Sequence, residues 1–245
     1  MKNLIYPIIF VCFTFTSIEV LSDTDKAKKG PFSGNLNIGF SKLSGNVDTE
    51  TLNYGLLFNH KKGVNKLIFK VNGNESQVND NIIKKDMLIS LLDIYNFNKI
   101  SAVYGKVSYL ENEFIGYNYL AKLGMGYLHT FLDDDKKKFS TRLGFQARQF
   151  EEATSGHTDN PNFLLVGCRG SYPIMKNILI KTEVNYEVNF ENKDDYESDA
   201  EVGFTFKVNK TIDLELSYKV QYYKIPKFEK ERTDRNLVTK LVYNF

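Results

Sequence analysis

Residues 178–190 read ILIKTEVNYEVNF, and polar and apolar side chains alternate through the whole stretch. The even-numbered positions carry Ile, Thr, Val, Tyr and Phe, whereas Lys, Glu and Asn predominate at the odd-numbered positions. A period of two residues is typical of a β-strand that has one apolar face and one polar face. This stretch therefore predicts a strand, and the segments that follow it repeat the pattern.

The alternation continues through residues 200–208 and 212–222. Across the three segments the apolar face has 18 positions and no charged residue, whereas eight of the 15 positions on the other face are charged. Strands in globular proteins usually have about five or six residues, so alternation this clean over longer segments is unusual. A strand that faces lipid requires such alternation on its outer face, because a Lys or Arg side chain at the middle of the bilayer lowers the stability of a barrel by about 2–4 kcal/mol.

Similar segments recur along the chain, which indicates a closed barrel. We expect strands near residues 32–43, 50–60, 65–74, 84–95, 100–110, 116–129, 138–150, 162–172, 178–190, 198–208, 212–223 and 234–245. A tilted membrane strand needs about 9–11 residues, and an even strand number brings both termini to one side. Closure also pairs every backbone group inside the sheet. The predicted fold is all-β: a closed antiparallel up-and-down transmembrane β-barrel of about twelve strands over residues 32–245.

The connections between these segments alternate in length, as short periplasmic turns and longer outer loops do. The tight connections are Lys61–Val64, Pro173–Asn177 and Asn209–Thr211, and the longer polar ones are Glu75–Ile83, Glu151–Pro161, Glu191–Tyr196 and Lys224–Arg232. The outer connections around Gly45 and Glu113 are short, so the rule holds only in part. All five prolines fall outside the expected strands: Pro7, Pro31, Pro161, Pro173 and Pro226.

Aromatic residues are abundant, with 19 Phe and 15 Tyr but no Trp. Many lie near segment ends on the expected apolar face, where they would form the interfacial girdles of a membrane barrel. The examples are Tyr117, Tyr127, Phe139, Phe163, Tyr172, Phe190 and Tyr222. Ordinary aromatic packing in a soluble β-core is the alternative explanation.

The N-terminal segment predicts export. Lys2 precedes an apolar stretch over residues 4–16, and Glu19 ends it. This pattern fits a secretory signal peptide over residues 1–22, with an uncleaved anchor helix as the alternative. A short tail over residues 23–31 would precede the barrel. Cleavage would remove Cys12 and leave Cys168 as the one cysteine of the mature chain, without an internal disulfide.

The last segment alternates up to Phe245, an aromatic residue in the final position of the sequence. This resembles the C-terminal signal that the barrel-assembly machinery recognises on outer-membrane proteins. Together with the signal peptide, this C-terminal pattern predicts that the protein is located in the outer membrane of a Gram-negative-type bacterium. Its expected partners are outer-membrane lipids and the barrel-assembly machinery.

Charge and cysteine content exclude several other classes of protein. The 32 basic and 30 acidic residues give a net charge of +2, which argues against a nucleic-acid-binding protein. Two cysteines are too few for a Cys-based zinc cluster. We expect no metal and no cofactor.

Three short elements carry a resemblance to a known family. They are GFSKLSGNVDT at residues 39–49, YLENEF at 109–114 and GMGY at 124–127. They resemble the family of salt-induced outer-membrane proteins, a family of unknown function. The resemblance implies an outer-membrane barrel and a link to salt stress, and it implies no catalytic residues.

The polar faces of the segments predict what the barrel interior contains. The first three segments contribute mainly neutral groups: Asn35, Asn37, Ser41, Thr51, Asn53, Asn59 and Asn72, with Lys70. The middle segments contribute Lys106, Lys122, Arg142, Arg148 and Arg169. The later segments contribute Glu183, Glu187, Asp199, Glu201, Asp213 and Glu215, with Lys181, Lys207 and Lys219. A basic wall would thus face or adjoin an acidic wall.

These charged side chains are the candidate lumen-lining residues, and two interpretations of them stay open. Either water fills a narrow lumen and the opposed charges select small polar solutes or ions, or the walls pair and close the barrel. Twelve strands lie between the filled eight-stranded and the open sixteen-stranded barrels, so size does not decide.

Two further classes of function receive little support. No Gly-x-Ser-x-Gly or His-Glu-x-x-His motif accompanies His60, His129 and His157, so we expect no enzyme, an outer-membrane lipid hydrolase included. Acidic pairs such as Glu151-Glu152 and Asp194-Asp195 would allow cation-bridged surface binding, but solvated loop charge is the commoner explanation of such pairs.

Overall fold

The computed structural model describes residues 31–43, 49–78, 81–112, 117–134, 137–153, 155–225 and 232–245. The predicted signal peptide, most of the predicted tail, the family elements at 44–48 and 113–114, and Pro226 lie outside the described residues.

Strands make up nearly all of the described chain. They are β1 (Phe32–Leu43), β2 (Thr49–Lys62), β3 (Asn65–Val78), β4 (Asn81–Asn96), β5 (Ser101–Asn112), β6 (Tyr117–Asp133), β7 (Lys138–Glu152), β8 (Thr158–Asp159), β9 (Asn162–Met175), β10 (Ile178–Asn189), β11 (Tyr196–Lys207), β12 (Ile212–Tyr223) and β13 (Thr233–Asn244). Within the described ranges, no helix is long and apolar enough to cross a membrane.

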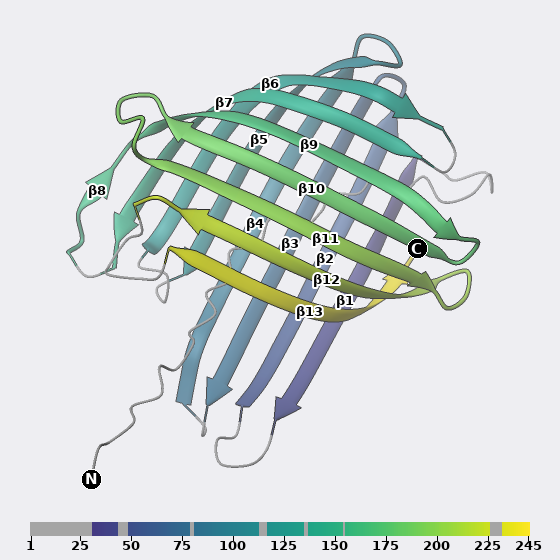
Figure 1. The fold of residues 1–245 in the computed structure, drawn as a ribbon, viewed down its shortest axis with the longest axis horizontal. Helices are drawn as coiled ribbons and strands as arrows, with labels where there is room; N and C mark the ends of the chain where they lie inside the picture. The colour runs from purple at the N-terminus through teal and green to yellow at the C-terminus, as the bar shows by residue number, and fades with distance from the viewer. Residues whose placement is uncertain are drawn as a thin grey trace.

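Twelve of these strands form one closed antiparallel barrel, which confirms the predicted fold class (Figure 1). Each strand pairs with the next along the chain, and β1 closes the ring by pairing with β13 from Asn35↔Asn244 to Ile38↔Leu241. The two-residue β8 pairs only with the end of β7, so it belongs to an outer connection and not to the wall.

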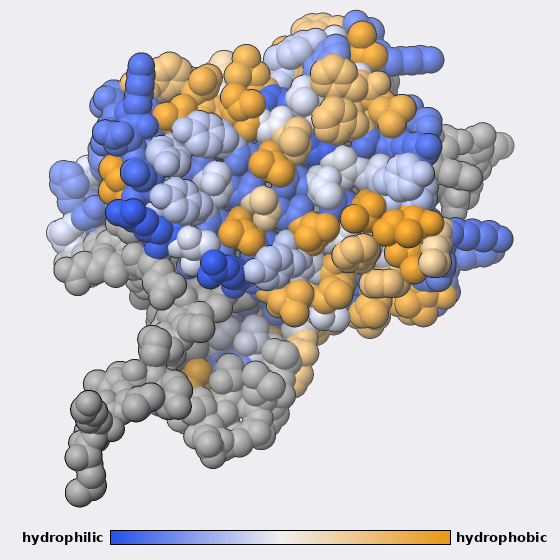
Figure 2. All heavy atoms as spheres, in the orientation of Figure 1, coloured by the Kyte–Doolittle hydropathy of each residue, from blue (hydrophilic) through white to orange (hydrophobic). Residues whose placement is uncertain are grey.

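The two-residue alternation sets which side chains face outward. Val184 on β10 is 49% exposed, whereas its neighbour Glu183 is 7% exposed and Lys219 on β12 is also 7% exposed. The apolar face therefore points away from the interior, and the charged face points into it. Figure 2 shows apolar and aromatic side chains over the face formed by β9–β13, while the protruding hydrophilic side chains gather toward the two ends.

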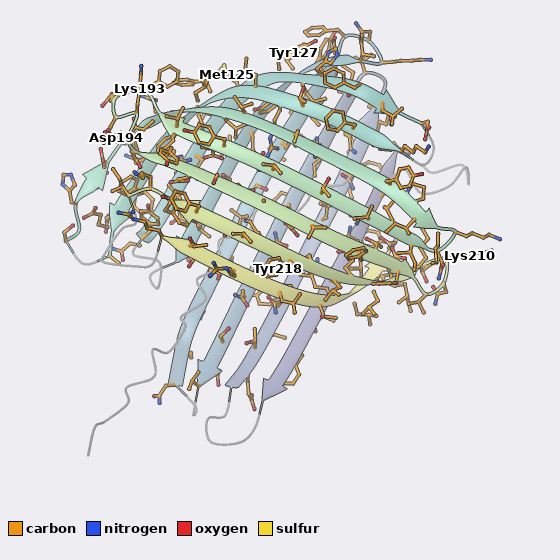
Figure 3. All side chains as sticks on the ribbon, viewed as in Figure 1. Met125, Tyr127, Lys193, Asp194, Lys210 and Tyr218 are labelled. Carbon is orange, nitrogen blue, oxygen red and sulfur yellow. The ribbon has the colours of Figure 1, made fainter. Side chains whose placement is uncertain are left out.

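Aromatic residues near the strand ends partly form the expected outer girdles. Tyr127, Phe139, Tyr172 and Phe190 are exposed on the outer face. Figure 3 shows Met125 and Tyr127 projecting from β6, with Lys193 and Asp194 at one end of the barrel and Lys210 at the other.

The expectation was wrong for two aromatic residues, which lie inside the barrel. Phe163 is 2% exposed, because it lies an even number of residues from the inward-facing Arg169 on a strand with no bulge between them. Tyr117 precedes a register shift at Tyr119 and packs against the inner residue Phe150, with ring centroids 5.0 Å apart. A bulge changes the face on which a residue points, and alternation alone does not reveal it.

Two connections also differ from the expectation. Residues 75–78 and 81–83 extend β3 and β4, so the polar stretch Glu75–Ile83 is mostly a strand hairpin and not a loop. Pro173 lies inside β9, next to the register shift opposite Ile178, where a strand tolerates a residue without an N–H group.

The inner face also carries two apolar clusters, which the alternation did not predict. One cluster contains Ile68, Leu92, Ile94, Ala102 and Leu128, with Leu57 and Tyr104 against it. The other contains Leu110, Leu120 and Phe150, with Leu88 and Tyr117 against it. Close packing of these clusters stabilises the wall formed by β2–β7 from the inside.

A charge on the outer face tests the assignment of that face to lipid. Val184→Lys is expected to lower the free energy of unfolding in lipid vesicles by about 2–4 kcal/mol, because the ammonium group would lie in hydrocarbon. Ile225→Lys, at an exposed position just beyond β12, is the control and should cost less than about 1 kcal/mol. Equal stability of the two variants in a urea titration would contradict the assignment.

Candidate functional site

Arg148 on β7 is the centre of the first of three charged clusters on the inner wall. Its Nη2 donates to Oε2 of Glu187 on β10, and its Nη1 donates to Oε1 of Glu197 on β11 at 2.9 Å. The guanidinium also lies over the ring of Phe163, 3.5 Å from its centroid. Because the Arg148 side chain is only 4% exposed, both carboxylates and the ring are needed to offset the removal of its charge from water.

The second cluster joins β7 to β10 and β11. Nη2 of Arg142 donates to Oε1 of Glu183 at 2.6 Å, and its Nε donates to Oδ1 of Asn185 at 3.1 Å. The Asn185 amide group in turn donates to Glu183 and to Asp199, each at 3.0 Å. Asn185 thus links the basic group to two carboxylates.

Gly167 on β9 makes this second cluster possible. It lies in register between Arg142 on one side and Asn185 on the other. A Cβ atom at this position would lie 2.2 Å from Oδ1 of Asn185 and 3.0 Å from Nε of Arg142. The absence of a side chain therefore lets Arg142 reach across β9, which is a recognised use of glycine in a strand.

The third cluster lies on β10–β13. Nζ of Lys181 donates to Oε1 of Glu215 at 2.7 Å, and the Thr205 hydroxyl donates to the same oxygen at 3.2 Å. A cavity of about 50 Å³ adjoins this pair. Its lining comprises Lys181, Glu201, Gly203, Phe204, Thr205, Glu215, Leu216, Ser217, Val238 and Lys240.

The remaining candidate residues also lie on the inner face, near groups of opposite charge. Lys106 and Lys122 interact electrostatically with Glu187, and Lys219 interacts with Asp199 and Glu201. Nε of Arg169 donates to the Ser140 hydroxyl at 3.4 Å. Asp213 accepts a 2.9 Å hydrogen bond from Asn244. The basic and acidic walls adjoin at β9 and β10, and the ion pairs between them join arginines of β7 to glutamates of β10 and β11.

The wall formed by β1–β3 is mainly neutral, as expected. Asn53, Asn72 and Asn74 are buried on its inner face, together with Lys70. The Asn74 amide donates to Asp86 on β4 at 3.3 Å, and the Thr51 and Ser76 hydroxyls lie 3.2 Å apart. Charge is therefore concentrated on one side of the interior.

Sequence reasoning missed Asn185, Glu197 and Lys240. In the alternation Asn185 is only a neutral polar position, but in the structure it is 1% exposed and contacts three charged groups. Glu197 lies just before residue 198, where the alternation predicts that its strand starts, so the pattern does not include it. An interior glycine such as Gly167 on a long strand was the available signal for a close approach of side chains.

The histidines lie apart from these clusters. Nδ1 of His129 is 3.2 Å from the hydroxyl oxygen of Tyr127, which is itself 2.7 Å from the Ser101 hydroxyl. The His60 ring stacks on Phe32 with centroids 4.5 Å apart. Within the described part of the chain, no group of three or more His, Cys, Asp or Glu side chains is placed to hold a metal ion.

Comparison with known proteins identifies a family. The sequence profile of the family described as a protein of unknown function, DUF481, matches residues 36–245. The chain belongs to this family. No curated protein matches the sequence. The DUF481 match covers nearly the whole barrel.

Solved structures similar to this DUF481 chain include two porins and the translocator domain of an autotransporter. The KdgM porin is 13% identical, with a TM-score of 0.49, and the match covers 87% of this chain and 99% of that chain. The NanC porin is 9% identical, with a TM-score of 0.48 and coverages of 86% and 97%. The translocator domain of the autotransporter NalP from Neisseria meningitidis is 11% identical, with a TM-score of 0.47 and coverages of 89% for both chains.

Proposed function

We propose that this DUF481 chain is a bacterial outer-membrane protein, exported by a cleaved signal peptide, that forms a narrow pore for small polar solutes or ions. The inner wall carries the proposal. Three ion-paired clusters follow one another along β7–β13, opposite a wall of asparagine and serine side chains. Polar side chains of this kind attract water and small ions, and pores use them to select solutes.

The position of the charges suits a selective and not a wide pore. Arg142 is 24% exposed and Glu215 is 33% exposed, so both remain accessible to water in the interior. Arg148 is buried between its two carboxylates and Phe163. A solute would therefore pass polar groups that are already ion-paired with each other. Replacing one member of such a pair would leave the other member unpaired and would change the net charge along the path of the solute.

A closed barrel without transport is the second candidate. The deep burial of Arg148, Asn185 and Lys219 favours it, because interior side chains packed this closely leave less room for water. Conductance separates the two candidates.

The test uses the full mature chain, purified and inserted into planar lipid bilayers in a tenfold KCl gradient. We expect small, discrete current steps from the native protein. Arg142→Ala frees Glu183 and Asn185 from their cation, so the reversal potential should shift toward that of potassium. Arg235→Ala removes an exposed arginine near the start of β13 and should leave the reversal potential unchanged. Current no greater than that of a protein-free bilayer would support the closed barrel.

A link to salt stress is part of the proposal and is supported only by the resemblance to salt-induced outer-membrane proteins. Deletion of the gene should slow growth in high NaCl relative to growth in equiosmolar sucrose. Equal growth in the two media would remove this part of the proposal and leave the pore unaffected.

We propose no catalytic role. Among the described residues, the side-chain hydrogen bond of His129 joins its Nδ1 to the Tyr127 hydroxyl, which is not a partner that a hydrolytic triad uses. Hydrolysis of phospholipid in mixed micelles by the purified protein, lost in His129→Ala, would contradict this proposal.

A further inference from the structure

Two nitrogen donors on β7 are buried without an acceptor. Among the described residues, nothing accepts a hydrogen bond from Nε2 of Gln146 or from Nε of Arg148, although both atoms are shielded from water. Gln146 is only 8% exposed. The two Nη atoms of Arg148 are used by Glu187 and Glu197, so its Nε is the donor that remains. Buried donors are normally paired, because an unmet hydrogen bond is unfavourable away from water.

The two donors lie within a group of basic side chains from three neighbouring strands. Gln146 and Arg148 are two positions apart on β7, so they point to the same, inner face. Gln146 pairs with Gly124 on β6, and Arg148 pairs with Lys122 on the same strand. Lys106 on β5 pairs with Gly124 from the other side. Gly124 therefore lies at the centre of the group.

Gly124 leaves room between these side chains. A Cβ atom there would meet the backbone oxygen of Phe145 at 3.5 Å and the Cβ and Cγ atoms of Gln146 at 3.9 Å, so it would fit without a clash. The Gln146 side chain thus runs beside Gly124 at van der Waals distance. At Gly126, in contrast, a Cβ atom would lie 2.7 Å from the hydroxyl oxygen of Tyr104, so a side chain already occupies that place.

Positive charge exceeds negative charge around Lys122. It interacts electrostatically with Arg148 and Lys106, which carry the same charge, and with Glu187 and Glu197. Both of these carboxylates accept hydrogen bonds from Arg148. In the part of the chain that the structure describes, no carboxylate lies within ion-pair distance of the Lys122 ammonium group. A negatively charged ligand would balance this excess.

The chemistry of the three nitrogen groups also favours an anion over water. An amide NH₂, a guanidinium and an ammonium group donate hydrogen bonds, and their nitrogens accept none. An anion accepts from all three, whereas a water molecule must also find acceptors for its own hydrogens. Because Nε2 of Gln146 and Nε of Arg148 are shielded, the ligand must be compact. Lys122 is only partly buried and its chain is flexible, so its movement can admit a small ion.

We propose that the inner wall binds one small monovalent anion, such as chloride, over Gly124. Its ligands are Nε2 of Gln146, Nε of Arg148 and the ammonium group of Lys122. The site extends the Arg148 cluster toward β5 and β6. The inference does not rest on the proposed pore, because a barrel that conducts nothing can still bind an ion, and the bilayer currents report on the pore separately.

The first test measures stability against chloride. The full mature chain in lipid vesicles is unfolded with urea, while sodium chloride replaces sodium gluconate at constant ionic strength. We expect the folding equilibrium constant to rise several-fold, in proportion to chloride once the site is mostly filled. Gln146→Leu and Lys122→Met should each lose most of this rise. Gln221→Leu and Lys219→Met, the same changes at buried positions of β12, are the controls and should keep it.

Gln146→Leu gives a second, sharper readout. In gluconate alone this variant should be at least as stable as the native protein, because it removes a buried donor that has no acceptor. In chloride the order should reverse, since only the native protein gains the bound ion. A residue that merely packs against its neighbours would not produce this reversal.

Crystals of the native protein soaked in sodium bromide test the position without any variant. We expect anomalous scattering from one bromide ion over Gly124, within hydrogen-bond distance of Gln146 and Arg148. A water molecule at this place would overturn the proposal, as would a native stability that does not depend on chloride. An equal chloride effect in all four variants would reveal a general salt effect and would also contradict it. Bromide without a chloride-dependent stability would mean binding at crystal concentration only, which likewise refutes the proposal.

Discussion

Replacing Arg148 with alanine is expected to lower the free energy of unfolding by about 3–5 kcal/mol, the usual cost of breaking a buried ion pair by removing one partner. Glu187 and Glu197 would each lose the same donor and remain close together on the inner wall. The Phe163 ring would lose its cation as well. Urea titration of the barrel in lipid vesicles, followed by tyrosine fluorescence or gel mobility, measures the change.

The control for this prediction is Arg235→Ala, which removes an exposed arginine and should cost less than about 1 kcal/mol. Arg148→Met combined with Glu187→Gln and Glu197→Gln removes the charges together and should recover most of the lost stability. A loss below about 1 kcal/mol for Arg148→Ala would show that water reaches both carboxylates and that the cluster is not dry.

Gly167→Val is expected to destabilise the barrel by about 2–4 kcal/mol, because it overpacks the wall and separates buried hydrogen-bond partners. The new Cβ would lie 2.2 Å from Asn185 and 3.2 Å from the backbone oxygen of Val184, so the Asn185 side chain must move. Arg142 would then lose its route across β9 to Glu183. In the bilayer experiment the reversal potential should shift in the same direction as for Arg142→Ala.

Gly105→Val is the matched control, since a Cβ atom at Gly105 meets nothing within 4 Å. It places the same side chain on β5 and should change the free energy of unfolding by less than about 1 kcal/mol. Equal destabilisation by the two substitutions would mean that valine at any glycine of the wall is harmful. The specific role of Gly167 in positioning Arg142 would then be contradicted.

The pairing of the charged groups depended on register, which alternation does not specify. The sequence predicted that Arg142 and Glu183 share the inner face, but β9 lies between their strands. Their contact required a glycine at position 167, opposite both Arg142 and Asn185. Likewise Glu197 joined the site only because β11 begins at Tyr196, two residues earlier than the alternation suggested.

The two-residue period of the side chains is enough to predict twelve barrel strands, an apolar exterior and a charged interior. One face of every strand must be apolar because it contacts lipid, and this requirement is visible in each segment alone. The tertiary structure decided which charges meet, where bulges turn Tyr117 inward, and where β1 and β13 separate. These features depend on the stagger between neighbouring strands. The stagger between neighbouring strands is set by hydrogen bonds between different segments of the chain, so it cannot be predicted from the residue pattern of any one strand.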